Sequence, residues 1–321
     1  MQTPKEALLA LYRGAKADFI PAENLIQKDL AFPGERYFGS DQKGYDAWGV
    51  NWTQLGPDPG LDGSTVSANF KLFDDMEDWK EHVNFPNLNQ LPVKEVLQGQ
   101  ASQFNSDEAV ISGLLLSGQF ERLNEMIGME DALCAFYEYP DEMHEYMDAM
   151  CEYKLKCIEL TYDAIQPDMI QMHDDWGTAQ NMFMSPDLWR EFIKPNEIRY
   201  AKKIHELGMI YEHHSCGYIM QIVPDLIEIG IDVISPLNVC NDLDTLLESY
   251  GDKITFKGGI NNQLLDEGEC DAIQIREEVI SKMDQYARKG RYVPGFIYSR
   301  HDVLDIFNEE VNKYGADIFK K

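Results

Sequence analysis

The sequence lacks any apolar run of about 18 residues, the length that a membrane-spanning helix needs, so we expect no membrane span. Its opening residues, Met-Gln-Thr-Pro-Lys-Glu, contain no secretory apolar core, and the predicted location is the cytoplasm. Basic residues are also scarce, with 28 Lys and Arg against 56 Asp and Glu, a net charge of −28. Because such a charge repels phosphate groups, neither nucleic acid nor an anionic membrane is expected as a partner.

Cysteine is sparse, and the glycine motif of dinucleotide-binding folds is missing. No Gly-x-Gly-x-x-Gly run follows a predicted strand, so the sequence does not support a Rossmann-type dinucleotide site. The cysteines are scattered and form no dense framework, which predicts reduced thiols. The six are Cys134, Cys151, Cys157, Cys216, Cys240 and Cys270.

The chain does contain a regular alternation of short apolar strands and amphipathic helices. This alternation favours a parallel sheet surrounded by helices, and we expect an α/β fold closed into a (β/α)8 TIM barrel. A doubly wound open sheet is the alternative. We expect one domain over residues 1–321, with an N-terminal extension or lid and the first elements in 1–105 and regular repeats in 106–321. Strands are predicted near residues 110–116, 168–173, 209–213, 233–235, 254–257 and 292–293. The longer helices are predicted near residues 3–18, 140–162, 186–206, 219–229, 271–288 and 302–314.

Polar side chains follow four of the predicted strands, in residues 173–177, 213–217, 236–242 and 298–302. In a barrel of parallel strands all four clusters face one mouth, which is where such barrels carry their chemistry. Asp174 and Asp175 are adjacent, and two buried carboxylates at this spacing need a donor, a metal or a raised pKa. The alternative is that one of them caps the helix that follows the loop.

His214 and Cys216 stand two residues apart where a predicted strand ends. On an extended backbone they point the same way, and an imidazole and a thiolate that converge on one point form half of a zinc site. A buried cysteine beside a hydrogen-bonded histidine is the alternative. Further upstream, Trp48 and Trp52 lie close to glycines, which suggests a shaped wall or lid, with ordinary loop packing as the other interpretation.

Several segments match a known family, from about Gly44 to the C-terminus. They are Asp-Ala-Trp-Gly-Val at 46–50, His-Asp-Asp-Trp-Gly at 173–177, Met-Ser-Pro at 184–186, Phe-Ile-Lys-Pro at 192–195, His-Ser-Cys-Gly at 214–217 and Phe-Lys-Gly-Gly-Ile at 256–260. In these segments the chain resembles the uroporphyrinogen decarboxylase superfamily, and specifically its methyltransferase branch. The resemblance implies a (β/α)8 barrel. The true decarboxylases bind a tetrapyrrole with an arginine-rich N-terminal segment, whereas this chain opens with Arg13 and Arg36 only, so porphyrinogen decarboxylation is not expected.

The resemblance also implies a zinc site. Several members of the methyltransferase branch bind zinc through a His-x-Cys pair, which His214 and Cys216 match, and through a later cysteine near the last strand. No cysteine occurs in residues 293–300, where that ligand should fall. Cys240, which follows the next predicted strand, is therefore the expected third ligand, and one position stays open for substrate. The other options are Asp174, Asp175 and His301.

By this resemblance, the expected function is transfer of a methyl group from an O-methyl donor, an aryl methyl ether, to the cobalt(I) corrinoid of a partner protein, with Zn²⁺ as Lewis acid. The expected catalytic residues are His173, Asp174 and Asp175. The expected substrate-binding residues are Trp48, Trp176, Asn238, Tyr298 and His301. The alternatives are methyl transfer from a methylated corrinoid protein to a thiol, a metal-free decarboxylase, and a non-catalytic ligand-binding barrel. A homodimer is also left open.

Overall fold

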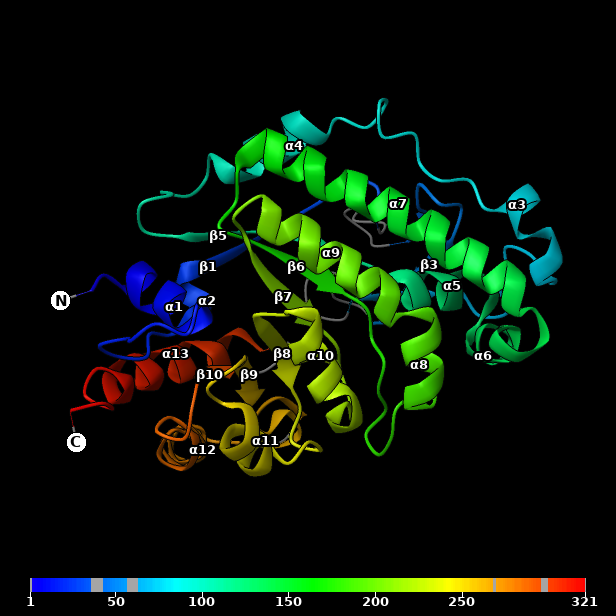
Figure 1. The fold of residues 1–321 in the computed structure, drawn as a ribbon. Helices are drawn as coiled ribbons and strands as arrows, with labels where there is room; N and C mark the ends of the chain where they lie inside the picture. The colour runs from blue at the N-terminus through cyan, green and yellow to red at the C-terminus, as the bar shows by residue number, and fades with distance from the viewer. Residues whose placement is uncertain (1, 36–42, 57–62, 268–269, 296–299, 321) are drawn as a thin grey trace.

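The computed structural model describes residues 2–35, 43–56, 63–267, 270–295 and 300–320. Within these residues the central element is a seven-stranded parallel sheet in the order β1-β5-β6-β7-β8-β9-β10 (Figure 1). Its strands are β1 (Gln27–Ala31), β5 (Val110–Leu115), β6 (Met169–His173), β7 (Ile210–His214), β8 (Val233–Leu237), β9 (Thr255–Gly259) and β10 (Tyr292–Gly295). From β6 onward each strand pairs with the strand that precedes it along the chain, and helices connect them, as in repeated β–α units.

Side chains inside the sheet show that it curls into a barrel. Gln27 on β1 donates a hydrogen bond of 3.1 Å to the carboxylate of Glu212 on β7, and the ammonium of Lys257 on β9 lies 2.6 Å from the same carboxylate. In a flat sheet β1 and β7, three strands apart, would be separated by about 14 Å. These contacts therefore require a curved sheet whose interior is filled by side chains, and the predicted (β/α)8 barrel fold is confirmed.

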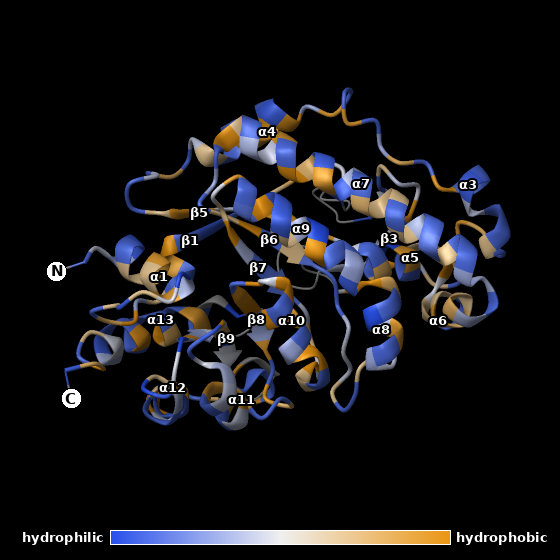
Figure 2. Ribbon diagram, viewed as in Figure 1, coloured by the Kyte–Doolittle hydropathy of each residue, from blue (hydrophilic) through white to orange (hydrophobic). Residues whose placement is uncertain are grey.

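The helices cover the outside of the sheet (Figure 1). In Figure 2 the strands β5 to β8 are largely hydrophobic, whereas surrounding helices such as α9 and α12 alternate between hydrophilic and hydrophobic residues, which is the pattern of helices with one buried face. The helices are α1 (Pro4–Tyr12), α2 (Glu23–Ile26), α3 (Trp79–His82), α4 (Val93–Ala101), α5 (Gln119–Ile127), α6 (Met129–Glu138), α7 (Pro140–Ile165), α8 (Pro186–Phe192), α9 (Lys194–Glu206), α10 (Val223–Ile229), α11 (Leu243–Tyr250), α12 (Ala272–Tyr286) and α13 (His301–Gly315). Short turns of other helix types are Met76–Asp78, Met220–Ile222 and Gln263–Glu267. None of the described helices is both long enough and apolar enough to cross a membrane.

The helix predicted over residues 186–206 is two helices, so that prediction is wrong. Helix α8 ends at Phe192, and α9 begins at Lys194 with Pro195 in its first turn. Proline has no N–H to donate and its ring clashes with the preceding turn, so a continuous helix through Pro195 is disfavoured. The break turns α9 so that it packs against α7 and β7.

The region before residue 105 contains more strand than the sequence predicted. Strand β1 lies at one edge of the described sheet, where it pairs with β5. A separate antiparallel sheet is formed by β2 (Gly44–Tyr45), β3 (Asn51–Gln54) and β4 (Ser64–Val66). The buried Asp46 carboxylate ties this small sheet to the barrel, because it accepts hydrogen bonds from the indole of Trp52 and from the guanidinium of Arg122 on α5.

Candidate metal centre and pocket

The strands β6 and β7 end side by side and each carries a histidine at its last position. The parallel register pairs His173 with His214, and the two rings stack with centroids 3.9 Å apart and an interplanar angle of 19°. Because both residues lie at the carboxyl ends of strands, they face the mouth of the barrel where (β/α)8 enzymes place their reactive groups. The pairing of these two strand ends therefore brings two imidazoles to one point.

Cys216 and Asp175 join the two histidines from the loops that follow these strands. The Cys216 Sγ lies 3.7 Å from the His214 Nε2, and the Asp175 Oδ1 lies 3.8 Å from the same nitrogen. The Asp175 Oδ1 also accepts the backbone N–H of Cys216 at 2.7 Å, which fixes the two loops relative to each other. Gly217 lets the chain turn directly after the thiol, since its φ of +82° is open to glycine at little cost.

The spacing of these atoms fits a small, nitrogen- and sulfur-binding cation. A tetrahedral zinc ion with bonds of about 2.0–2.3 Å holds its donor atoms roughly 3.3–3.8 Å apart, and the two separations from His214 lie within or at the edge of that range. His173, Asp175 and His214 each offer a ligand atom, all within 4.8 Å of one another. The donor set, imidazole and thiol with a carboxylate, is the set that zinc prefers.

The electrostatic surroundings of Cys216 also favour a cation. Burial, followed by the negative charges of Asp175 and Glu121, raises the pKa of the Cys216 thiol well above its usual value. A neutral thiol beside two carboxylates is a site in which positive charge would be stabilised, and a bound cation would make the thiol lose its proton. Burial therefore opposes the free thiolate, and binding of a metal by Cys216 would be coupled to release of the thiol proton.

Glu121 was not among the residues predicted from the sequence. It is the third residue of α5, the helix that follows β5, and its carboxylate lies 2.8 Å from the His173 Nδ1. Both side chains are mostly buried, at 13 % and 15 % exposure. A carboxylate on one imidazole nitrogen holds the ring in place and directs the other nitrogen outward, as is usual for metal-bound histidines. The available signal was its position, one turn beyond the carboxyl end of a barrel strand.

Asp174 points away from the cluster and caps α5. Its carboxylate accepts the backbone N–H groups of Glu121 at 2.7 Å and Phe120 at 3.3 Å, and the indole N–H of Trp176 at 3.1 Å. Burial first, and then the charge of Glu121, raise its pKa to about 7. Asp174 therefore does not cap the helix that follows its own loop, as the alternative interpretation had it, but the helix of the preceding repeat.

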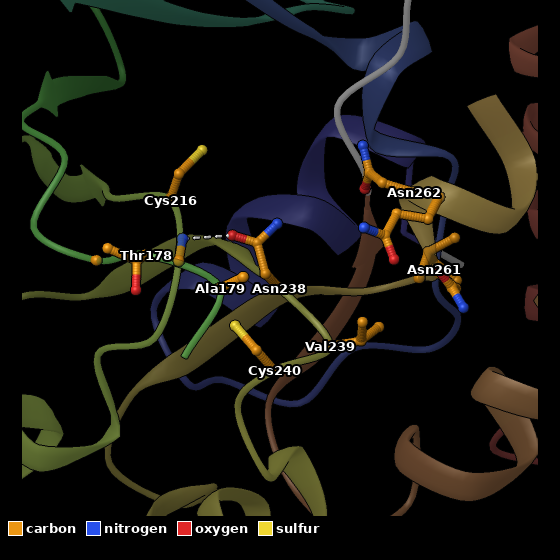
Figure 3. A pocket seen from close by; sticks show the side chains of 12 residues that line it. Thr178, Ala179, Cys216, Asn238, Val239, Cys240, Asn261 and Asn262 are labelled. Atoms are coloured by element: carbon orange, nitrogen blue, oxygen red, sulfur yellow. Dashed lines mark hydrogen bonds between the residues drawn. The ribbon is translucent and has the colours of Figure 1, made fainter. Parts of the chain in front are cut away.

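A pocket of about 440 Å³, lined in part by Cys216, opens beside the candidate metal cluster (Figure 3). Cys216 and Cys240 project from the loops after β7 and β8, and Asn238 links these loops by accepting the backbone N–H of Gly217 at 2.7 Å. Cys240 contributes to the wall of the pocket. Among the described residues, the group that could hold a metal ion consists of His173, Asp175 and His214, so neither Cys216 nor Cys240 belongs to it, although Cys216 lies 3.7 Å from His214. The lining residues are Gly177, Thr178, Ala179, Cys216, Gly217, Asn238, Val239, Cys240, Ile260, Asn261, Asn262 and Gln263.

Comparisons with known proteins show which family the chain belongs to. The family model for uroporphyrinogen decarboxylase matches residues 62–296. The chain belongs to the uroporphyrinogen decarboxylase family. A solved structure of a methyltransferase from Methanosarcina mazei superposes with a TM-score of 0.72 over 98 % of this chain and 99 % of that chain, at 15 % sequence identity, which shows a shared fold. A search of curated proteins found no match.

The uroporphyrinogen decarboxylase match includes both halves of the cluster, since residues 173–177 and 214–217 lie inside it. The segment at 46–50 lies outside it. The two tryptophans that were expected to bind substrate are packed in the interior of the protein. Trp48 is 2 % exposed and lies under the Arg122 guanidinium, and Trp176 is 0 % exposed and stacks on His213 at 3.9 Å.

The other predicted residues are placed as follows. Asn238 lines the pocket. His301 begins α13, and its side chain is outside the described part of the chain. Tyr298 lies outside the described residues. The structure thus brings His173, Asp175, His214 and Cys216 together at the mouth, places Asn238 and Cys240 next to them, and leaves the roles of Trp48, Trp176, Tyr298 and His301 as predictions.

Proposed function

We propose that the protein is a methyltransferase that moves a methyl group from an O-methyl donor, an aryl methyl ether, to the cobalt(I) corrinoid of a partner protein. The observation that carries the proposal is the cluster of His173, Asp175, His214 and Cys216 at the barrel mouth, beside a pocket large enough for a small molecule. The fold shared with the Methanosarcina mazei methyltransferase supports the same reaction class.

The residues proposed to hold zinc are His214, Cys216 and His173. His173 is preferred over the originally expected Cys240 because Glu121 already orients its ring, as second partners of metal-bound histidines do. Three protein ligands leave the fourth position open. Zinc bound there supplies Lewis-acid chemistry toward the ether oxygen of the donor.

Asp175 is proposed to act on the leaving oxygen. Its side chain is 30 % exposed and is fixed by the Cys216 N–H, so one carboxylate oxygen is held while the residue still faces the mouth. In the transfer, the electron pair of cobalt(I) forms the new bond to the methyl carbon, and the carbon–oxygen bond breaks with its electrons on the aryl oxygen. Asp175, once protonated from water, would donate a hydrogen bond to that oxygen or supply the proton that makes it a phenol.

Metal analysis of the purified protein tests the ligand assignment. His214→Ala, Cys216→Ser and His173→Ala should each lose most of the zinc that the wild type retains. Cys240→Ser and Cys270→Ser are the matched controls and should keep it. Zinc contents that stay at the wild-type level in both His214→Ala and Cys216→Ser would overturn the assignment, and loss in Cys240→Ser would restore Cys240 as a ligand.

Free cob(I)alamin can replace the partner protein in a test of the reaction. With an aryl methyl ether, methylcobalamin formation is followed by absorbance, and Asp175→Asn should keep its zinc but form methylcobalamin at least tenfold more slowly. Undiminished turnover would remove Asp175 from the mechanism. The second candidate, transfer from methylcobalamin to a thiol, is favoured if a thiol is methylated by the zinc-loaded protein while ethers remain unchanged.

A further inference from the structure

The pocket beside the cluster is lined only by uncharged groups among the residues that the structure describes. Its polar side chains are the carboxamides of Asn238, Asn261, Asn262 and Gln263 and the hydroxyl of Thr178, with the thiols of Cys216 and Cys240. No Lys, Arg, His, Asp or Glu from the described ranges contributes to the wall. A small-molecule site usually contains few polar groups, and their chemistry indicates which ligand they recognise.

Asn238 is positioned to donate a hydrogen bond into this space. Its Oδ1 accepts the Gly217 N–H at 2.7 Å, which fixes the orientation of the amide group. The Nδ2 then points away from that bond, as Figure 3 shows, and it finds no acceptor within the described part of the chain. A fixed amide N–H next to the Cys216 thiol is suited to a neutral oxygen of a ligand, such as a hydroxyl or an ether.

The charges around the pocket disfavour an anionic ligand. The carboxylates of Asp175 and Glu121 act on Cys216, which lines the pocket, and the whole chain has a net charge of −28. Away from the position proposed for zinc, a ligand carboxylate in the pocket would lose its water without gaining a cationic partner from the described wall, which is a costly exchange. An uncharged ligand loses little on entry and can use the carboxamides.

We propose that the pocket selects an uncharged, hydrogen-bonding methyl ether and rejects ethers that carry a carboxylate. This inference rests on the proposed methyltransferase function and names the class of its donor. Asn238 is the residue that sets the preference for neutral groups, because its fixed Nδ2 donates to oxygen without offering a positive charge.

Three compounds that differ at one position separate the possibilities: 4-hydroxy-3-methoxybenzyl alcohol, 4-hydroxy-3-methoxybenzoate and 4-hydroxy-3-methoxybenzylamine. Isothermal titration calorimetry of the purified, zinc-containing protein at pH 7 measures their binding without any corrinoid. The alcohol should bind at least tenfold more tightly than the benzoate. Equal or tighter binding of the benzoate, or no binding of the alcohol at millimolar concentration, overturns the inference.

Asn238→Asp adds one negative charge and keeps an oxygen that can accept the Gly217 N–H. It should weaken binding of the alcohol several-fold and strengthen binding of the benzylamine relative to the wild type. Gln263→Glu adds a negative charge at another part of the pocket wall, and it is the substitute test variant if Asn238→Asp fails to fold. Asn89→Asp, at an exposed position away from the pocket, is the control and should leave all three affinities unchanged. Unchanged affinities in both pocket variants would remove these carboxamides from ligand selection.

The two proposals fail in different ways. If the protein does not methylate cob(I)alamin but the alcohol still binds more tightly than the benzoate, the reaction is wrong and the neutral pocket stands. If methylcobalamin forms equally well from the benzoate and the alcohol, and both bind equally, the reaction stands and the selection for uncharged donors is wrong.

Discussion

Lys257→Met should be strongly destabilising, because this lysine is the cation of a buried charge network inside the barrel. Its ammonium lies 2.6 Å from Glu212 and 3.1 Å from Glu23, and Asp29 on β1 adds a third carboxylate nearby. Burial opposes the charge on Lys257, but the surrounding carboxylates, Glu212 first, outweigh burial and raise its pKa well above the usual value. The variant removes the only described cation that faces these carboxylates.

The size of the effect follows from the burial of the pair. Glu212 is fully buried and the Lys257 side chain is 10 % exposed, so neither carboxylate nor ammonium is solvated by bulk water. Removal of one partner from such a pair costs about 3–5 kcal/mol, because the remaining charge is buried without compensation. By contrast, Lys313, which is 72 % exposed beside Glu310, should contribute about 0–1 kcal/mol.

Urea unfolding followed by tryptophan fluorescence and circular dichroism measures these differences. Lys257→Met should lose several kcal/mol relative to Lys313→Met, and the double variant Lys257→Met with Glu212→Gln should recover part of the loss. The Glu212 pKa is lowered from 4.5, since Lys257 outweighs the opposing effect of burial. A lowered carboxyl pKa contributes stability that is present above pH 4.5 and is lost as pH falls through the folded value, so the deficit of Lys257→Met should be larger at pH 7 than at pH 4. A loss below about 1 kcal/mol at pH 7 would refute the argument.

Three further variants test local parts of the structure. Glu121→Gln should weaken zinc retention about 10–100-fold in a chelator competition, because His173 loses the carboxylate that orients it; unchanged retention would remove that role. Gly217→Ala should destabilise the fold and release zinc, since its Cβ would lie 2.2 Å from the backbone of the β6 loop, and a normal unfolding curve with full zinc would contradict this. The hydrogen bond to Asp232 raises the pKa of His205, so the stability it contributes is complete below pH 6.5 and is lost as pH rises through the higher folded value. NMR titration should show a His205 pKa above 6.5, and His205→Gln should abolish this pH dependence of unfolding.

The repeats of the second half could be predicted because their strands are short and mostly apolar, although Glu212 interrupts β7 and Lys257 interrupts β9. β1 could not be predicted, since it is largely polar and the buried Gln27 points into the barrel, where the Glu212 carboxylate compensates for it by accepting a hydrogen bond. That compensation joins residues more than 180 positions apart, and no local pattern reveals it. The small sheet of β2, β3 and β4 has short, partly exposed strands, so it lacks the hydrophobic signal that marks a core strand.

The pair of His214 and Cys216 could be predicted because two positions along a strand end point the same way. The addition of His173 depends on the register of β6 against β7, which pairs it with His214 and which the sequence does not determine. The same limit applies to Glu121, since an acidic residue in the first turn of a helix is common and carries no information about the histidine it will contact. The sequence likewise does not reveal that Asp174 caps α5 whereas Asp175 joins the cluster, because this depends on where α5 lies relative to Asp174.

The neutral pocket and the negatively charged cluster have a joint consequence for the proposed reaction. An aryl methyl ether enters without charge, whereas breaking its carbon–oxygen bond leaves negative charge on the aryl oxygen. No described group in the pocket wall offers a positive charge to retain that anion, and Glu121 repels it unless it is neutralised at the mouth. An Asp175 side chain that has first taken up a proton from water could pass it to the aryl oxygen, which would both complete the transfer and restore a neutral product that the pocket releases as readily as it admitted the donor. On this reasoning Asp175→Asn should slow product release as well as bond breaking. A pre-steady-state burst of methylcobalamin would show that product release limits turnover, whereas its absence would show that the chemical step does.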